Sequence, residues 1–412
     1  MVERAYVPSR SYDCELIIKD VDYSSSPREV ASVKVISSLI SYWTVVQITV
    51  LVGPGDIILD GIHGQDPIKL KIRLQNEEGN MLDEVNMELM YLSSALDMPI
   101  KDSKEQEAQK DRVAYSFVTV SRPAFKTMTS LVNEVYEAKS PKEIVESMAS
   151  DVGASIEYDS EDANTNQIPQ ICIPPTTLYQ AIKFMDMGYG LFNGISSIYC
   201  QYDNKIYVRN LTKKMKKSQI FTAYLWSMDS SEDEKKSQKE LDGKLFMTQY
   251  PVMNNYRGNS VTSILSKQLV HITCPNDKLY ETIEQDIVDL SKSYGLIYKG
   301  SEIPIDSNIE SRKKYFIEHT GGEGSGYFAT AMISKKIAEL ATINITLDRN
   351  LIVSVLLNVG EVVMFDTDNE VYRDLTGKYI LKSSEITFSR SKTKTDMTVS
   401  ARLQLTRTNK TI

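Results

Sequence analysis

Ile173–Leu211 is the stretch that most constrains how this chain can fold. Pro174 and Pro175 disfavour a helix before them, and Thr176 or Thr177 can cap a helix that starts immediately afterwards. The apolar residues that follow recur at positions i, i+3, i+4 and i+7, which is one face of an amphipathic helix: Leu178, Ala181, Ile182 and Met185. The sequence therefore predicts a helix with a fixed start and one buried face.

A tight hairpin is predicted directly after this helix. Gly188, Tyr189 and Gly190 end the helix, and we expect them to set backbone geometry rather than to bind a partner. After an Asn193-Gly194 turn come two runs rich in Tyr, Ile and Val, separated by Asp203-Asn204: Ser197–Tyr202 and Lys205–Asn210. The unit of helix, turn and hairpin carries no catalytic residue type where chemistry would need one, which points to an assembly role.

The length and charge of the chain limit its function. A chain of 412 residues can bury a large core and is expected to form two or more domains. The formal net charge of -8 argues against a nucleic-acid surface as the main role, because phosphate contacts need clustered Lys and Arg. One basic run, Lys213–Lys217, is followed by the Lys- and Glu-rich segment Ser230–Glu240, and we interpret the basic run as a solvated linker.

The cysteines predict no disulfide framework, and the N-terminal residues predict no signal peptide. The four cysteines are widely spaced and show no CxxC pattern, so neither a zinc site nor disulfides are predicted, and synthesis in a reducing cytoplasm is expected: Cys14, Cys172, Cys200 and Cys274. The first ten residues lack the apolar region of a signal peptide. The longest uncharged run, Val35–Pro54, could match a membrane span in length, but its hydroxyl and β-branched residues favour one or two sheet strands.

Residues 1–121 are predicted to be all-β, as a small antiparallel barrel or sandwich. Turn clusters such as Ser24–Pro27 and Glu78–Asn80 separate the strand-like runs. These runs are Cys14–Ser24, Glu29–Trp43, Val45–Gly53, Pro67–Asn76 and Ala114–Arg122. The charged interruption Met98–Arg112 is expected to be an exposed loop.

The pattern changes to mixed α and β after residue 121. The spacing of Met128, Leu131, Val132 and Val135 predicts a helix. Ser140 and Glu143, with a proline between them, have the form of a capping box that starts a second helix. We therefore expect a mixed α+β domain that contains the Ile173–Leu211 unit.

The C-terminal part returns to strand character with two predicted helices. Gly243–Tyr256 and Ser260–Cys274 are strand-like. A helix capped by Asn276 and extending to Tyr294 could pack on its own domain or form a seam with a partner helix, and another helix is predicted over roughly Tyr327–Thr342. The tail is expected to be β throughout: Ile343–Leu347, Leu351–Leu357, Glu361–Asp366, Lys378–Ser389 and Asp396–Thr406.

The sequence offers weak signals for enzymatic chemistry. Gly321 and Gly326 have the spacing of a phosphate loop, but Tyr327 and Phe328 stand where Lys and Ser or Thr are required, so a flexible loop before a helix is expected. The three histidines share no metal-ligand spacing and none pairs recognisably with a cysteine: His63, His271 and His319.

Two acidic segments begin like calcium-binding loops but lack residues that such loops need. Asp162–Asn166 is followed by Gln167 where the turn glycine belongs, and Ile173 stands at the position of the bidentate Glu. Asp366–Glu370 also lacks the glycine, so both segments are predicted to be ordinary turns. Paired carboxylates of a glycosidase cannot be recognised from spacing alone. The sequence therefore predicts no catalytic, cofactor-binding or metal-ligating residue and no cofactor.

Several segments together resemble the central hub protein of contractile-tailed bacteriophage baseplates: Ser140–Val152, Ile173–Leu211, Asn344–Asp366 and Gly377–Arg407. That family shares its fold with the N-terminal part of type VI secretion spike proteins. The resemblance implies a β-rich α+β fold with two tail-tube-like antiparallel β-barrel domains and a mixed α+β domain between them. The implied divisions are 1–121 for the first barrel, 122–245 for the mixed domain, 246–275 and 343–412 for the second barrel, and 276–342 for a helical insertion. The Ser230–Glu240 segment has no known role in the family.

The resemblance also implies a function. A hub is a non-enzymatic virion protein and a homotrimer, whose two barrels per subunit form a pseudo-sixfold ring that adapts the hexameric tail tube to the trimeric central spike. The implied partners are further copies, the tail tube protein and the central spike protein, with the tape measure and baseplate wedge proteins as further candidates. The resemblance implies no membrane partner. It implies that DNA contacts the hub only while it passes through the lumen during ejection, and the negative net charge is consistent with such passage. The implied location is the tail baseplate of a virion assembled in the host cytoplasm.

Two other classes stay open at this point. One is a different adaptor or binding module of a tail or contractile injection system, and the other is a cell-wall glycan hydrolase. A salt-resistant trimer would distinguish the hub from a monomeric module, and a peptidoglycan assay would identify the hydrolase.

Overall fold

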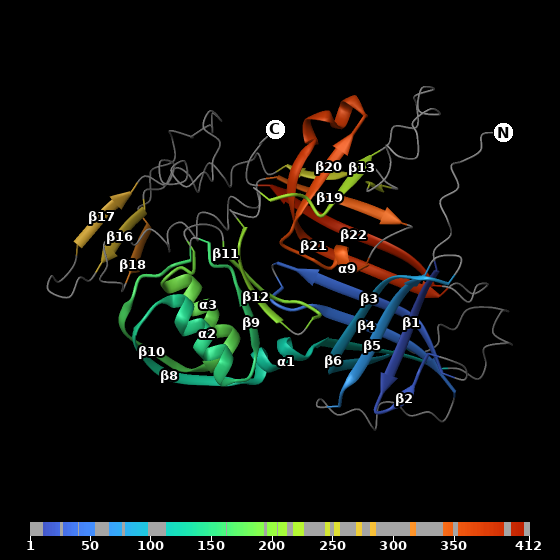
Figure 1. Ribbon diagram of the computed structural model, residues 1–412, viewed down its shortest axis with the longest axis horizontal. Helices are drawn as coiled ribbons and strands as arrows, with labels where there is room; N and C mark the ends of the chain where they lie inside the picture. Colours follow the sequence, from blue (N-terminus) through green and yellow to red (C-terminus); the bar gives the residue numbers. More distant parts are fainter. Residues whose placement is uncertain are drawn as a thin grey trace.

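The computed structural model of the chain describes residues 11–24, 28–39, 41–53, 66–75, 79–97, 113–161, 163–192, 196–203, 205–211, 217–225, 244–247, 251–255, 269–273, 281–285, 314–318, 341–348, 353–390 and 397–407. These residues form one large sheet, a mixed α+β layer beside it and a small separate sheet (Figure 1). The β-rich α+β class predicted from the sequence is confirmed.

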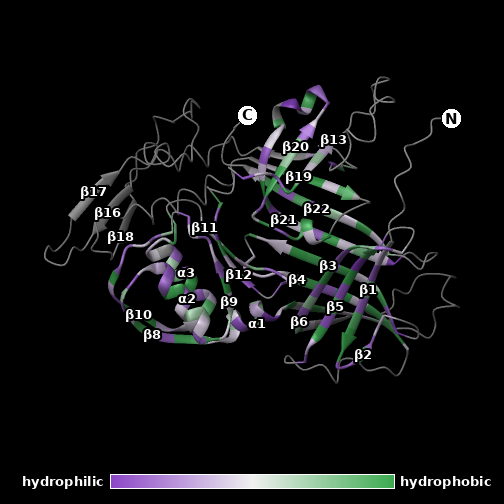
Figure 2. Cartoon of the chain, viewed as in Figure 1, coloured by the Kyte–Doolittle hydropathy of each residue, from purple (hydrophilic) through white to green (hydrophobic). Residues whose placement is uncertain are grey.

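Six strands from the first part of the chain make most of a closed ring of paired β-strands, which we call the first ring. In pairing order they are β3 (Glu29–Ser38), β4 (Val45–Val52), β7 (Val113–Ser121), β6 (Met81–Asp97), β5 (Ile68–Gln75) and β1 (Ser11–Ile18). All neighbours are antiparallel, and the short β2 (Val21–Asp22) pairs with β1. Buried and accessible residues alternate along β5, because successive side chains of a strand point to opposite faces. The strand accordingly carries both hydrophobic and hydrophilic residues (Figure 2). The predicted strands of this part are confirmed, and the uncharged run from residue 35 is the β3–β4 pair.

Two strands from the end of the chain close this ring. β21 (Gly377–Arg390) pairs with β3 over Ser383–Ser389, and it pairs with β22 (Met397–Arg407). β22 in turn meets β1 at the pair Tyr12–Met397. The first ring therefore needs both ends of the chain.

The same two strands belong to a second strand ring. Its other members are β20 (Val362–Thr367), β13 (Phe221–Leu225), β14 (Lys244–Phe246), β15 (Val252–Asn255) and β19 (Ala341–Asp348). On one side, β21 pairs with β20, β20 with β13, and β13 with β14. On the other side, β22 pairs with β19, and β19 pairs with β15. An isolated bridge between Met247, directly after β14, and Leu347 of β19 joins the two sides.

The second ring differs from the predicted antiparallel barrel. β13 runs parallel to both β14 and β20. Parallel neighbours need long connections, and β13 ends at Leu225 whereas β14 begins only at Lys244 and β20 at Val362. Phe221–Leu225 was expected in the mixed domain, but it pairs with β20 in this ring.

A bulge divides β21 between the two rings. The register of β21 against β22 shifts between Leu381 and Ser383. Before the shift β21 pairs with β20, and after it β21 pairs with β3. A continuous apolar core fills both rings, and it includes Leu16 and Phe117 of the first ring and Phe365 and Tyr379 of the second.

The mixed layer lies beside the rings and has its own core. Its helices are α1 (Arg122–Thr129), α2 (Pro141–Asp151) and α3 (Leu178–Gly188), and its strands are β8 (Leu131–Lys139), β9 (Ser155–Tyr158), β10 (Ile168–Thr177), β11 (Ser196–Cys200) and β12 (Lys205–Asn210). β8 and β10 form an antiparallel ribbon that wraps around α2 and α3 (Figure 1). β11 and β12 form an antiparallel hairpin, with β9 parallel to β12.

The local signals of the mixed layer were predicted correctly. Thr177 is the N-cap of α3 and accepts a hydrogen bond from the Gln180 amide. The four residues of the predicted apolar stripe of this helix are fully buried: Leu178, Ala181, Ile182 and Met185. Ser140 and Glu143 form the predicted capping box at the start of α2.

Two predictions of secondary structure were wrong in the described residues. The helix expected through Leu131, Val132 and Val135 is strand β8, because its backbone pairs with β10 from Leu131 to Lys139. The strand expected over Leu351–Leu357 contains a short helix, α9 (Val353–Leu356), which buries Val353 and Leu356 against the core.

A separate three-stranded sheet consists of β16 (Leu269–Thr273), β17 (Glu281–Gln285) and β18 (Lys314–Glu318). Two predictions are corrected here. β16 pairs with β17 and β18 and not within the second ring, and Glu281–Gln285 is a strand where a helix was expected, since its backbone pairs with β16.

Several predicted features lie wholly or partly outside the described residues: the Met98–Arg112 loop, the Asn193-Gly194 turn, the basic run with Ser230–Glu240, the rest of the Asn276–Tyr294 helix, the glycine cluster and residues 327–340 of the last helix. Thr342, where that last helix was expected to end, lies in β19. In the part of the chain that the structure describes, no helix has the length and apolar character needed to cross a membrane.

We predict that the two rings unfold together, because they share β21, β22 and one core. Phe388 belongs to the first ring and Phe365 to the second, and both side chains are fully buried. Phe388→Ala and Phe365→Ala should each lower the free energy of unfolding by about 3–5 kcal/mol. Both should shift the same calorimetric transition to lower temperature. Two transitions, each shifted by only one of the substitutions, would contradict a shared unit.

Candidate interaction surface

The mixed layer is joined to the first ring at the turn between β3 and β4. The Cys200 amide donates to the Tyr42 carbonyl at 2.5 Å, and the Thr44 amide donates to the Cys200 carbonyl at 3.1 Å. The Tyr179 ring on α3 lies 4.2 Å from the Tyr42 ring and 5.6 Å from the Trp43 ring, measured between centroids. Both the helix and the hairpin of the Ile173–Leu211 unit therefore contact the first ring.

A second junction joins the same hairpin to the second ring. Tyr199 and Tyr207 stack with centroids 5.5 Å apart, and the Arg209 guanidinium lies 4.5 Å from the Tyr207 ring centroid. Gly360, in the turn before β20, has a φ of +85°, and a Cβ at this position would lie 3.0 Å from the Tyr199 hydroxyl. The close approach requires glycine on both counts.

Arg209 of β12 links the hairpin to β9 and to the residue that follows it. Its guanidinium donates to Asp159 at 2.9 Å and to Glu157 at 2.6 Å. The hydrogen bond from Arg209 lowers the pKa of the Glu157 carboxyl. Burial raises the pKa of the Tyr199 hydroxyl, so this residue stays neutral. The two junctions hold the mixed layer and both rings in one arrangement, so that they present fixed surfaces.

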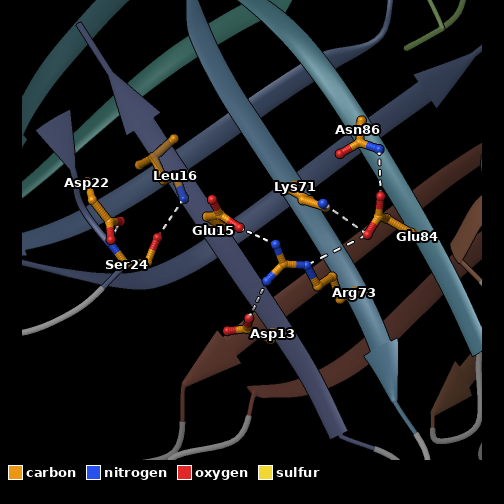
Figure 3. Close-up of polar contacts among 9 residues, drawn as sticks. All are labelled: Asp13, Glu15, Leu16, Asp22, Ser24, Lys71, Arg73, Glu84 and Asn86. Atoms are coloured by element: carbon orange, nitrogen blue, oxygen red, sulfur yellow. Dashed lines mark hydrogen bonds and ion pairs between the residues drawn. The ribbon is translucent and has the colours of Figure 1, made fainter. Parts of the chain in front are cut away.

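The outer face of β1, β5 and β6 carries a ladder of charges (Figure 3). The Arg73 guanidinium of β5 lies between carboxylates of both neighbouring strands, with ion pairs to Asp13 at 3.5 Å, to Glu84 at 3.7 Å and to Glu15. Lys71 pairs with Glu84 at 3.1 Å. The cations of β5 stand opposite acidic residues because Asp13 and Glu84 are both register partners of Arg73. A slip by one residue would turn these charges toward the core, so the ladder favours this register.

A hollow of about 400 Å³ lies beside the ladder, between this face and the β11–β12 turn. Its charged lining residues are two lysines of β5 and three carboxylates around them: Lys69, Lys71, Glu15, Glu88 and Asp203. A cationic strand between two acidic ones can match a protein surface with the opposite pattern. We take this face as the candidate interaction surface.

Two of the described cysteines, Cys14 and Cys200, are poor nucleophiles. Cys14 and Cys200 are buried, and burial raises the pKa of Cys200 to about 12 and that of Cys14 further above its ordinary value. Both thiols therefore stay protonated. Cys172 is exposed on β10, and Cys274 lies outside the described residues.

The described residues of the two acidic segments, Asp162–Asn166 and Asp366–Glu370, form hydrogen bonds with the rest of the fold. The Asn164 side chain donates to the Tyr189 and Gly190 carbonyls at 3.0 Å each, which holds its loop to the end of α3, where Gly190 has a φ of +70°. Asn369 caps the 3-10 helix η3 (Glu370–Leu375) by accepting from the Val371 amide. Among the described residues no group of three His, Cys, Asp or Glu side chains is placed to hold a metal. His271 lies in β16, and the other histidines fall outside the description.

Sequence reasoning missed the charge ladder. Its signal is present: β5 alternates apolar residues with Lys69, Lys71 and Arg73, while β1 and β6 carry acidic residues at the same period. The pattern becomes a site only when the register of the three strands is known.

We predict a specific cost for adding a methyl group at Gly360. Gly360→Ala combines a positive φ with a clash against the Tyr199 hydroxyl, and should lower the free energy of unfolding in urea by about 1–3 kcal/mol. Gly79→Ala is the control, since Gly79 has a φ of +80° with nothing within 4 Å of the added Cβ. It should cost less. Adding Tyr199→Phe should recover part of the Gly360→Ala loss in a double-mutant cycle, and a coupling of zero would contradict the contact.

We also predict an acid-sensitive contribution from the ladder. The hydrogen bond from Asn86, followed by that from Lys71, lowers the pKa of Glu84 below its ordinary 4.5. A lowered carboxyl pKa contributes stability above the unfolded pKa, and this stability is lost as the pH falls through the folded pKa. Glu84→Gln should lower the urea midpoint at pH 7, and the difference from the unchanged protein should shrink as the pH falls below 4.5. The difference at pH 7 should also shrink in 1 M salt, where the Debye length is about 3 Å, and a difference that stays constant as the pH falls would refute the assignment.

Comparisons with known proteins find one matching family model and several solved structures with a similar fold. A protein-family model described as "Bacteriophage PBS1 gene 109 protein" matches residues 84–286, just under half of the chain. No curated protein sequence matches the chain.

Two solved tail proteins are similar over nearly their whole length. The tail protein from Neisseria meningitidis MC58 matches with a TM-score of 0.57 and 12% identity, covering 96% of this chain and 97% of that chain. The 43 kDa tail protein of prophage MuSo2 from Shewanella oneidensis matches with a TM-score of 0.55 and 10% identity, covering 97% and 99%. The chain therefore has the β-rich α+β fold of phage tail proteins, and the predicted resemblance to baseplate hub proteins is confirmed at the level of the fold.

Proposed function

We propose that this chain is a structural protein of a phage tail, the trimeric hub of a baseplate. The observation that carries the proposal is the presence of two strand rings in one chain, built on the shared pair β21–β22. Three copies would present six rings, which suits an adaptor between a sixfold tail tube and a threefold spike. The shared fold with tail proteins supports a role in the tail.

The proposed partners are those that the resemblance to hub proteins implies. One end of the trimer binds the tail tube protein and the other binds the central spike protein, with the tape measure and baseplate wedge proteins as neighbours. DNA passes through the central channel without specific binding, and the net charge of -8 favours passage over retention. The protein acts as a scaffold in the virion after assembly in the host cytoplasm, and the division into barrel, mixed and inserted segments is part of the same proposal.

The oligomeric state tests the proposal directly. Light scattering behind a sizing column should give a mass close to three times 46.6 kDa, at both low and high salt. End views in negative-stain electron microscopy should show six similar lobes around a channel. A monomer that persists when the tube and spike proteins are added would contradict the hub, and release of soluble fragments from peptidoglycan would favour the hydrolase.

A further inference from the structure

The connection between β20 and β21 exposes an apolar residue at the end of the second ring. η3 forms most of this connection, and Val371 on it is 82% exposed. Figure 1 shows the connection as a projection beyond β20, on the side of the second ring that faces away from the first ring. We call residues 369–373 the η3 tip.

The η3 tip is held in one conformation by hydrogen bonds. The Asn369 side chain accepts from the Val371 amide at 2.9 Å, and the Asn369 carbonyl accepts from the Tyr372 amide at 3.1 Å. Leu375, at the end of η3, is buried, and its carbonyl accepts from the Tyr379 hydroxyl at 2.6 Å. A segment that is already ordered loses little conformational entropy when it binds.

Two charged residues lie beside Val371 on the η3 tip. Glu370 and Arg373 are exposed, and neither forms an ion pair with any residue that the structure describes. They are three positions apart, and residues at this spacing lie one above the other in a 3-10 helix. The η3 tip therefore presents one apolar residue with one negative and one positive charge next to it.

The hollow beside the charge ladder offers the complementary set. Ile17 and Tyr202, both half-buried, supply apolar surface. Lys69 is exposed on β5, Asp203 lies in the β11–β12 turn, and in the described part of the chain neither has an ion-pair partner. The other three charged lining residues already form ion pairs: Glu15, Lys71 and Glu88. One cation and one anion of the hollow are thus left for an occupant.

The η3 tip and the hollow lie too far apart to meet within one chain. Figure 1 shows the projection beyond β20 at the opposite end of the two rings from β5 and β6, which line the hollow. Contact between them therefore needs a second copy of the chain. Because the two surfaces differ, the contact is heterologous, and it closes into a ring of three when each copy is rotated by a third of a turn from the last.

We propose that the η3 tip of one copy seats in the hollow of the next copy and so joins the chains of the trimer. Val371 covers the apolar part of the hollow. On one side of it Glu370 pairs with Lys69, as an ammonium and a carboxylate. On the other side Arg373 pairs with Asp203. The inference rests on the proposed trimer, to which it assigns the contacts between chains.

Charge reversal at one of the two pairs tests the contact in the full chain. Lys69→Glu and Glu370→Lys should each raise the protein concentration at which half of the trimer dissociates, measured by light scattering, at least about tenfold. The two substitutions combined in one chain restore an opposite pair and should bring this concentration back to within about threefold of that of the unchanged protein. Both residues are exposed, so the urea midpoint of the dissociated chain should not change.

A matched pair of variants tests the apolar contact. Val371→Asp should also weaken the trimer at least about tenfold. Leu131→Asp is the control, because Leu131 is 71% exposed on β8, and it should leave the trimer intact.

The outcomes separate this inference from the proposed function. A trimer that withstands the single substitutions at the η3 tip and the hollow, or that the combined charge reversal does not rescue, would overturn the inference and leave the trimeric hub in place. An unchanged protein that stays monomeric at every concentration, with and without the tube and spike proteins, would overturn both.

Discussion

The pairing of β21 with β22 is the interaction on which the rest of the structure depends. The ladder runs from Ile380–Thr406 to Arg390–Met397, and both rings close through it. The register shift between Leu381 and Ser383 leaves an extra residue on β21, and a bulge of this kind bends a strand and increases its twist. The bend lets one strand follow β20 in one ring and β3 in the other. Without it, the chain would need separate strands for the two rings.

The bulge also locates the mixed layer. The Leu39 amide donates to the Lys382 carbonyl at 2.9 Å, and the Gly360 amide donates to the Leu381 carbonyl at 2.8 Å. One turn from each ring thus donates a backbone hydrogen bond to β21 at the bulge. Tyr199 of the mixed layer approaches the second of these turns at Gly360, so the three parts of the fold meet around one irregularity in one strand.

The sequence was informative where the controlling interactions are local. The cap at Thr177 and the capping box at Ser140 involve residues three positions apart, and both were predicted correctly. The β8 segment was predicted as a helix because apolar spacings of three and four also occur when a strand has both an inner and an outer apolar face, as Val132 and Val135 show. Ring closure and the parallel pairing of β13 join residues far apart in the chain and leave no local signal. For the same reason the charge ladder could not be predicted without the register.

The shared pair has a consequence for the proposed trimer. Within a chain, the spacing between the two rings is fixed by continuous strands and one apolar core, which make the two rings a single body. Between chains, the spacing is set by surface contacts that must form on association. The six rings of a trimer would therefore alternate between two kinds of junction, and any mismatch with a sixfold tube would be taken up at the three junctions between chains, because these can adjust without breaking a strand.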